Sequence, residues 1–382
     1  MTGMSGDDSK IKVMHIIQSP GGVERYIRNF LKYINHEQFH NILICSDNYK
    51  RKNYIDCADD FENVNMVREI DLKSDISSII KVRKLIKKYK PDIVYCHSSK
   101  AGAIGRIANF GLKNKCIYNP HGWAFNMGHS EKKKKLYRII EKILAKLADK
   151  IICISGAEQK SALDRKICKL DKLQIINNGI DFSEYDNVPT VTKQEINIPP
   201  DAFVIGYVGR LTEQKSPDIF ARAAVQIKKN IPNAFFLMVG DGELKEETQQ
   251  IYIDNYMEDS YLITGWVENP MSYIKLFDVA TLLSRWEGFG LVLAEYMLAE
   301  KPIVATSVDA IPYIIQNRKN GLLASIDDIT QIYNHVLEIY QDSQLRNRLI
   351  QQAKEDVYQL YDAKRMVKEH EKLFLSICDV GV

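Results

Sequence analysis

The sequence has seven cysteines, and no two of them are spaced as Cys-x-x-Cys. An odd, scattered set of cysteines argues against both a disulfide framework and a zinc site. The chain also lacks any apolar run near the roughly 18 residues that a membrane-spanning helix needs, and residues 1–10 lack the apolar core of a signal peptide. We therefore expect mostly buried free thiols in a cytoplasmic protein that contacts membranes only at their surface.

Low-complexity tracts and internal repeats are also absent, and the composition is that of an ordinary globular protein. A chain of 382 residues is longer than one hydrophobic core usually supports, which predicts two domains. Residues 1–187 contain 33 Lys and Arg against 22 Asp and Glu, whereas residues 188–382 contain 19 against 27. The basic first half predicts an anionic partner, namely a phosphorylated acceptor, a lipid surface or a nucleic acid. The simpler explanation of the charge difference is an uneven distribution of surface charges with no partner involved.

Short apolar segments alternate with amphipathic helical segments along both halves of the chain. This alternation predicts an α/β fold with two doubly wound, Rossmann-like parallel sheets. The polar, proline-containing stretch 188–200 places the boundary between domains at 1–187 and 188–359. Ligands in such folds bind beyond the carboxyl ends of the strands, here in a cleft between the domains. The expected strands are 11–17, 42–45, 93–96, 116–119, 150–155, 203–208, 235–239, 261–264, 279–284 and 303–306.

The stretch from Trp286 to Ala299 carries two carboxylates around a glycine loop. Glu287 precedes Gly288 and Gly290, and an apolar run with helical spacing follows. Free backbone N–H groups at the start of that helix attract phosphate, and Glu295 is suited to accept hydrogen bonds from sugar hydroxyls. The simpler interpretation is a strand-to-helix turn with two solvated glutamates.

Two cations follow the strand 203–208 in the same way. Arg210 and Lys215 at a strand end suit a diphosphate and would balance the charge of a leaving nucleoside diphosphate. The chain has no Asp-x-Asp triplet of the kind that holds a metal against a diphosphate, so we expect no metal. In the first half, His121 lies in a Pro-His-Gly loop after the strand 116–119, where it is placed to make one hydrogen bond. The simpler interpretations are that Arg210 and Lys215 are ordinary surface charges and that His121 has a structural role.

Together these stretches resemble the retaining glycosyltransferases of family 4, which have the B-type fold of two facing Rossmann-like domains. The resemblance spans nearly the whole chain, and Tyr296 departs from it because Ala is common after the second glutamate. The matching stretches are Gly21-Gly22-Val23-Glu24-Arg25, His121-Gly122, Asn178-Gly179-Ile180-Asp181, Gly209-Arg210 with Lys215, Gly240-Asp241-Gly242 and Glu287-x7-Glu295.

The resemblance implies a role for each of these sites. Arg210 and Lys215 would contact the donor diphosphate. Glu287 and His121 would contact the transferred sugar, and Glu295 the ribose. Residues 360–382 would form a helix that packs back on the first domain. The remaining donor-binding residues would be Gly21, Gly22, Asn178, Gly209, Gly240, Trp266, Val267, Gly288, Phe289, Gly290 and Leu291.

In the retaining members of this family the acceptor attacks from the face that the diphosphate leaves. Glu287 would therefore position the sugar, and the two glutamates would not be the acid and base of a hydrolase. The resemblance implies a UDP-, GDP- or dTDP-linked sugar as donor, with no cofactor. The base and the sugar stay open.

The acceptor side is predicted from a basic segment of the first half. Trp123 and Phe125 precede the run Lys132, Lys133, Lys134 and Lys135, which continues on a helix with apolar residues. Such a segment docks on anionic lipid, although a solvated basic face is the simpler interpretation. We expect a peripheral enzyme at the inner face of a bacterial membrane that extends a polyprenyl-diphosphate-linked saccharide during surface-polysaccharide assembly.

Three rival functions would use some of the same residues. A nucleic-acid binder is disfavoured because aromatic residues are not interleaved through a basic stripe. A nucleotide-sugar epimerase of the same architecture and a catalytically silent partner subunit stay as alternatives.

Overall fold

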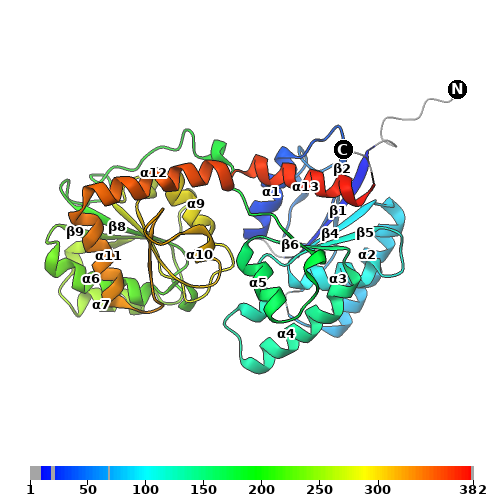
Figure 1. The fold of residues 1–382 in the computed structure, drawn as a ribbon, viewed down its shortest axis with the longest axis horizontal. Helices are drawn as coiled ribbons and strands as arrows, with labels where there is room; N and C mark the ends of the chain where they lie inside the picture. The colour runs from blue at the N-terminus through cyan, green and yellow to red at the C-terminus, as the bar shows by residue number, and fades with distance from the viewer. Residues whose placement is uncertain (1–9, 19–21, 68, 380–382) are drawn as a thin grey trace. The chain divides into compact units, whose positions relative to one another are not determined.

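The computed structural model describes residues 10–18, 22–67 and 69–379, which fold into two α/β units (Figure 1). The first unit runs to Gly179 and takes up the chain again from Ala363, and the second comprises Ile180–Asp362. This division lies a few residues before the boundary expected at 187. Each unit contains one wholly parallel sheet, so the predicted fold class is confirmed.

The first unit has a seven-stranded sheet in the order β3-β2-β1-β4-β5-β6-β7. Its strands are β1 (Ile11–Ile17), β2 (Phe39–Cys45), β3 (Asp60–Asn63), β4 (Ile93–His97), β5 (Lys115–Asn119), β6 (Lys150–Cys153) and β7 (Leu173–Ile175). Its helices are α1 (Gly22–Tyr33), α2 (Leu72–Tyr89), α3 (Ser99–Asn109), α4 (Glu131–Leu144), α5 (Gly156–Asp164) and α13 (Ala363–Ile377).

Apolar residues on both faces of this sheet make it a buried central layer. Along β1, Met14 and Ile16 pack into one core with α2 and α3, while Val13 and Ile17 pack into a second core with α1 and α13. Figure 1 shows these two helical layers on opposite sides of the strands. The last helix therefore belongs to the first unit, as the resemblance implies.

The second unit has a six-stranded sheet in the order β10-β9-β8-β11-β12-β13. Its strands are β8 (Phe203–Val208), β9 (Ala234–Val239), β10 (Tyr261–Ile263), β11 (Val279–Leu282), β12 (Ile303–Thr306) and β13 (Leu322–Ala324). Its helices are α6 (Pro217–Asn230), α7 (Lys245–Ile253), α8 (Met271–Ile274), α9 (Leu291–Leu298), α10 (Ile311–Ile314), α11 (Ile329–Gln341) and α12 (Ser343–Leu360).

In each sheet the order in which successive strands are added reverses at one point. This point lies between β1 and β4 in the first unit and between β8 and β11 in the second. In open parallel sheets such a point leaves a crevice at the carboxyl ends of the two strands, where ligands bind. The loops after β8 and β11 are those with the predicted cations and carboxylates. The strand order thus brings together two stretches that lie far apart in the sequence.

All seven cysteines are free thiols, and four of them are buried. Among the described residues, no helix combines the length and the apolar character that crossing a bilayer requires.

Candidate functional site

The centre of the candidate site is an ion pair between the loops after β8 and β11. The Lys215 ammonium contacts Glu287 Oε2, and Ser284 Oγ donates to the same oxygen at 3.2 Å. Glu287 is only 9% exposed, whereas Arg210 is exposed and its guanidinium has no ion-pair partner within the described residues. The structure thus pairs Lys215 with a buried carboxylate and leaves Arg210, a cation of the same loop as Lys215, exposed.

A second set of contacts joins the same two loops, reaches the start of α6 and the loop after β13, and was not predicted. Arg285 forms ion pairs with Asp218 at 2.9 Å and with Asp327 at 3.0 Å. Gln214 Nε2 donates to the carbonyl oxygen of Trp286 at 3.0 Å, and the Arg285 N–H donates to the carbonyl oxygen of Gln214 at 2.9 Å. These contacts hold the glycine loop in place, and no pattern in the sequence pairs these residues.

The backbone around Glu287 is held from the other side by Asp309, whose Oδ2 accepts the Glu287 N–H at 3.0 Å. Gly290 follows with φ 78°, a left-handed conformation that favours glycine, and α9 begins at the next residue, Leu291. The first N–H groups of a helix have no partner within it, so this start is suited to an anion. Gly288 and Phe289 lie in the same loop, with Phe289 buried.

Glu295 lies within α9 and is buried, with 6% of its surface exposed. Its Oε1 accepts a hydrogen bond from the Tyr185 hydroxyl at 2.9 Å. Tyr185 follows the Asn-Gly-Ile-Asp stretch and is a partner that the sequence did not predict. The carboxylate is therefore already oriented by a hydroxyl group.

Tyr296, the departure from the family pattern, has a structural explanation. Its hydroxyl accepts the N–H of Val208 at 3.0 Å and donates to the carbonyl oxygen of Thr281 at 3.1 Å. The side chain is fully buried, and burial raises the pKa of its hydroxyl. Tyr296 thus braces the ends of β8 and β11 directly beneath the two loops.

Gly240 serves the packing of this edge of the sheet. A Cβ atom there would lie 1.9 Å from the carbonyl oxygen of Gly209, so no other residue fits without moving the backbone. Gly240 also pairs with Gly265, which precedes Trp266 and Val267. Trp266 is 78% exposed, so a large aromatic surface is open to solvent at the end of β10.

In the first unit, His121 lies in the loop after β5 with a left-handed backbone, φ 50°. Its N–H donates to Asn119 Oδ1 at 3.0 Å, and the next N–H, that of Gly122, donates to Glu158 Oε1 at 2.5 Å. Burial raises the pKa of Glu158 to about 7, while the N–H groups of Ile154 and Gly122 oppose the shift. Glu158 is a buried anchor of the histidine loop that the sequence did not predict.

Two of the other predicted residues of the first unit, Gly22 and Asn178, lie within the described residues. Gly22 begins α1, whereas Gly21 lies outside the described residues. Asn178 is buried, and its Oδ1 has no hydrogen-bond partner within the described part of the chain.

The structure corrects the prediction that Trp123 and Phe125 belong to an acceptor or membrane surface. They are 1% and 2% exposed and stack on each other with ring centroids 5.2 Å apart. The Trp123 indole N–H donates to the carbonyl oxygen of Glu158 at 3.0 Å. Both rings fill the core beneath α4 because burying such large apolar surfaces is strongly favourable.

The helix that carries the lysines does present an exposed face. Leu136, Ile139 and Ile143 are 47%, 49% and 58% exposed. Lys132, Lys133 and Lys135 are exposed, and Lys134 pairs with Glu131 at 3.0 Å.

The opposite face of α4 is fixed by a buried ion pair. Arg106 Nη2 donates to Glu141 Oε2 at 2.9 Å, and the Tyr118 hydroxyl donates to Glu141 Oε1 at 2.8 Å. The Arg106 guanidinium also lies 3.7 Å from the centre of the Tyr118 ring. These contacts set which side of α4 points to solvent.

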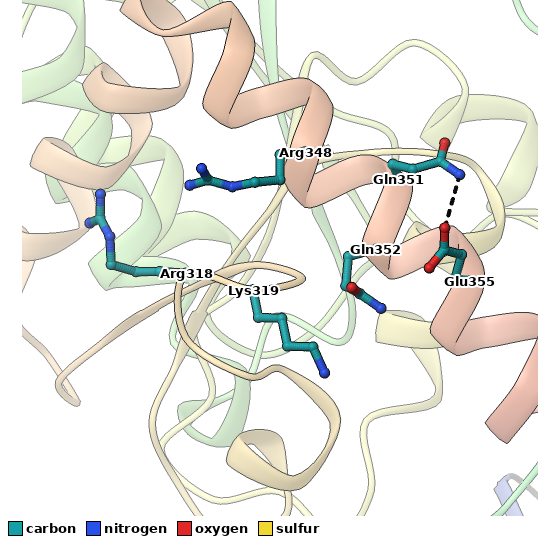
Figure 2. Close-up of a pocket in the computed structure, with 6 residues that line it drawn as sticks. All are labelled: Arg318, Lys319, Arg348, Gln351, Gln352 and Glu355. Atoms are coloured by element: carbon teal, nitrogen blue, oxygen red, sulfur yellow. Dashed lines mark hydrogen bonds between the residues drawn. The ribbon is translucent and has the colours of Figure 1, made fainter.

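A surface pocket lies elsewhere in the second unit, between α12 and the loop before β13 (Figure 2). Its polar groups are largely paired within the unit, since Arg318 contacts Glu338 and Gln351 Nε2 donates to Glu355 Oε1 at 3.3 Å. None of its residues was predicted to bind substrate. Figure 2 shows the lining residues Arg318, Lys319, Arg348, Gln351, Gln352 and Glu355.

Comparisons with known proteins agree with this arrangement. The family model described as Glycosyltransferase Family 4 matches residues 20–184, and the model described as Glycosyl transferases group 1 matches residues 188–356. The chain is 29% identical over 386 residues to the UDP-Gal:alpha-D-GlcNAc-diphosphoundecaprenol alpha-1,3-galactosyltransferase of Escherichia coli, covering 98% of this chain and 99% of that one. It is 25% identical to the capsular polysaccharide biosynthesis glycosyltransferase CapM of Staphylococcus aureus, covering 95% and 96% of the two chains.

Solved structures share the fold. A glycosyltransferase from Rickettsia africae ESF-5 superposes with a TM-score of 0.83 at 18% identity, over 97% of this chain and 100% of that one. Anabaena Alr3699/HepE, solved in complex with UDP, gives 0.80 at 19% identity, over 96% and 100%. With one model matching each half and the same two-unit fold throughout, the chain belongs to the family 4 glycosyltransferases of the B-type fold.

Proposed function

We propose that this glycosyltransferase moves a sugar, with retention of its anomeric configuration, from a nucleotide sugar to a lipid-diphosphate-linked saccharide in surface-polysaccharide assembly. The observation that carries the proposal is the cluster of Arg210, Lys215 and Glu287 at the reversal point of the second sheet. It joins cations for a diphosphate to a carboxylate for sugar hydroxyls.

The ion pair suggests how the donor enters. The Lys215 ammonium contacts Glu287, and a diphosphate would draw that ammonium toward itself together with the exposed Arg210. Glu287 would then accept hydrogen bonds from hydroxyls of the transferred sugar instead. Both partners stay satisfied, which matters because a buried unpaired carboxylate is costly.

The start of α9 supports the same placement. In this proposal the backbone N–H groups that follow Gly290 bind a phosphate of the donor, and Glu295 on the same helix accepts hydrogen bonds from the ribose hydroxyls. The Tyr185 hydroxyl already orients Glu295 and would share it with the nucleoside.

The reaction needs stabilisation of the leaving diphosphate more than it needs a base. Arg210, Lys215 and the start of α9 supply positive potential for that oxygen charge, and we propose that they do so without a metal ion. In the retaining transfer proposed here, the departing diphosphate oxygen takes the acceptor proton, and Glu287 positions the sugar and forms no bond to it.

The acceptor is assigned to the first unit. There we propose that α4 docks on an anionic membrane through its exposed apolar residues and lysines, while His121 of the same unit binds a hydroxyl of the transferred sugar and not of the acceptor. The Escherichia coli relative acts, by its name, on an undecaprenol-linked acceptor, which supports a lipid-linked acceptor here.

The proposal is tested by an assay of transfer to a synthetic lipid-diphosphate N-acetylglucosamine. UDP-galactose is tried first, followed by other UDP-, GDP- and dTDP-sugars. Arg210→Ala, Lys215→Ala and Glu287→Ala are each expected to lower the rate by about 10²-fold or more, the usual effect of removing a group that stabilises transition-state charge. Product with the same anomeric configuration as the donor, formed at an undiminished rate with a chelator present, is the expected result.

Arg318→Ala serves as the matched control because Arg318 is an exposed arginine of the same unit outside the site. Glu287→Gln accompanies Glu287→Ala, and thermal unfolding checks that each variant folds. Near wild-type rates in the three site variants would refute their roles. A new nucleotide sugar formed without any acceptor would instead indicate an epimerase, and loss of rate on chelation would refute metal independence.

A further inference from the structure

Three histidines form a hydrogen-bonded row from the interior of the first unit to its candidate site. His121 Nε2 lies 3.0 Å from His97 Nδ1. His97 Nε2 lies 3.3 Å from His15 Nδ1. His15 Nε2 in turn lies 3.3 Å from Asn41 Oδ1. The row therefore runs from the loop after β5, across the end of β4 and the interior of β1, to β2.

Each histidine in the row is neutral at physiological pH. Burial lowers the pKa of His15 and of His121 to about 3 and that of His97 well below its ordinary value. His370 of α13 faces the row and lowers these pKa values further, and burial also lowers its own pKa to about 4. A neutral imidazole has one N–H donor and one acceptor nitrogen, so every contact in the row has a direction.

The amide of Asn41 sets that direction. The structure places Asn41 Oδ1 against His15 Nε2 and leaves Asn41 Nδ2 without a partner among the described residues; with the amide in this orientation His15 carries its proton on Nε2, and its Nδ1 accepts from His97. By the same logic His97 carries its proton on Nε2 and accepts at Nδ1 from His121. All three rings are then Nε2–H tautomers, and Nδ1 of His121 keeps its lone pair at the outer end of the row.

The ring and backbone of His121 are fixed by further contacts. The His97 and His121 rings stack with centroids 5.3 Å apart, and Tyr26 packs edge-on against His121 at 4.6 Å. Asn119 accepts the backbone N–H of His121 and donates to the Tyr95 hydroxyl at 3.3 Å. Nδ1 of His121 has no hydrogen-bond partner among the residues that the structure describes.

We infer that His97 is a positioning residue that holds His121 as the Nε2–H tautomer, so that His121 Nδ1 accepts a hydrogen bond from a hydroxyl of the sugar substrate. The inference rests on the proposed function of His121. It adds a chemical requirement, since the group at the contacted position of the sugar must donate a hydrogen bond to His121 Nδ1. A deoxy or O-methyl sugar at the contacted position is therefore a poor substrate.

The tautomer is measured first, on the full chain labelled with ¹⁵N histidine and without substrate. Two-bond ¹H–¹⁵N spectra at neutral pH distinguish Nδ1–H from Nε2–H rings, and single substitutions assign the signals. His15, His97 and His121 are expected as Nε2–H tautomers. An Nδ1–H form of His121, or a mixture of both forms, overturns the inference whether or not the chain transfers sugar.

The role of His97 is tested by two substitutions. His97→Asn places an amide oxygen near the position of Nδ1, so it can still accept from His121 and is expected to keep kcat/KM within a few-fold of wild type. His97→Leu removes the acceptor and is expected to lower kcat/KM by about 10-fold, the worth of one hydrogen bond, with a mixture of His121 tautomers in the spectrum. His36→Leu is the control, on a histidine of the same unit whose ring hydrogen-bonds to the Leu31 carbonyl and lies outside the row.

Donor analogues complete the test. In a set of donors that each have one hydroxyl replaced by hydrogen, one analogue should react about 10-fold more slowly than its parent sugar when the enzyme is wild type. With His121→Ala, the same analogue and its parent sugar should react at equal rates. If His97→Leu keeps both full transfer activity and the Nε2–H tautomer, the inference fails and the proposed function stands. If wild type transfers no sugar from any donor, the proposed function fails and the sugar contact fails with it.

Discussion

At the scale of single residues, Ser216 carries backbone strain directly beside the Lys215 cation. It has φ 52° and ψ 54°, precedes α6, is fully buried, and its hydroxyl has no partner within the described residues. A left-handed backbone costs a residue other than glycine roughly 1 kcal/mol. Ser216→Gly is therefore expected to raise the free energy of unfolding by about 0.5–1 kcal/mol in urea denaturation, even after the entropy that glycine loses.

Ser216→Val is the comparison for this prediction, because a β-branched residue tolerates the left-handed region least. It is expected to unfold more easily than wild type. If glycine destabilises the chain, or if valine is neutral, the backbone at this position is not strained as described.

The pairing of Lys215 with Glu287 shows how far single residues can be interpreted from the sequence. The sequence identified both as candidates from their positions after predicted strands. It assigned the lysine to a diphosphate and the glutamate to a sugar, and gave no sign that the two contact each other. Their contact depends on β8 and β11 being neighbours, which no local pattern encodes.

At the scale of elements, α4 presents an apolar stripe to solvent between basic residues. Ile139→Asp with Ile143→Asp is expected to weaken binding to phosphatidylglycerol vesicles by about 10-fold or more, since each isoleucine contributes up to roughly 2 kcal/mol when buried in lipid. Stability should change by less than about 0.5 kcal/mol because both side chains are about half exposed. Vesicle sedimentation at low salt measures the binding.

Ile253→Asp is the matched control, on helix α7 of the second unit with 42% of the side chain exposed. It should leave vesicle binding unchanged. Wild-type chain that stays in the supernatant, or equal sedimentation of wild type and the double variant, would show that α4 is a solvated face.

The strands were predicted unevenly, and the missed strands share a feature. The strands β3, β7 and β13 were not predicted, and each is an edge strand of three or four residues. Edge strands are half exposed and short, so they lack the continuous apolar run that identifies a central strand. The central strands of both sheets were predicted because both of their faces are buried.

At the scale of the whole molecule, the buried histidines make the first unit sensitive to acid. His15, His97, His121 and His370 stay neutral when folded, whereas in the unfolded chain they take up protons below about pH 6.5. Unfolding therefore binds protons, and the free energy of unfolding falls as pH drops from about 6.5 to 4. The slope is up to about 1.4 kcal/mol per pH unit for each histidine. Glu158 partly opposes this change. Because its pKa is raised to about 7, the folded chain takes up its proton before the unfolded chain does, and this group adds to the free energy of unfolding as the pH falls from about 7 to 4.5.

Trp123 offers a direct measurement, because it is the one tryptophan of the first unit and the other two lie in the second. Urea unfolding followed by its fluorescence, in a chain with Trp266→Phe and Trp286→Phe, should show the loss below pH 6.5. His370→Gln should reduce the slope by about one proton. A free energy of unfolding that stays flat between pH 6.5 and 4.5 would contradict the burial of these neutral rings.

The sequence by itself determined what depends on neighbouring residues. The alternation of apolar strands and amphipathic helices gave the fold class, the glycines and charges after predicted strands gave the candidate residues, and the spacing of the α4 lysines and apolar residues gave a surface helix. These properties follow from side-chain periodicity and backbone conformation, which act over a few residues.

Only the tertiary structure decided which of these segments meet. The order of the strands brings Lys215 to Glu287 and aligns His15, His97 and His121, and it carries α13 back onto the first unit. It also buries Trp123 and Phe125, which the sequence had assigned to the surface. The physical reason is that local patterns report burial and conformation, whereas the partner of a buried group is chosen by the packing of the whole chain.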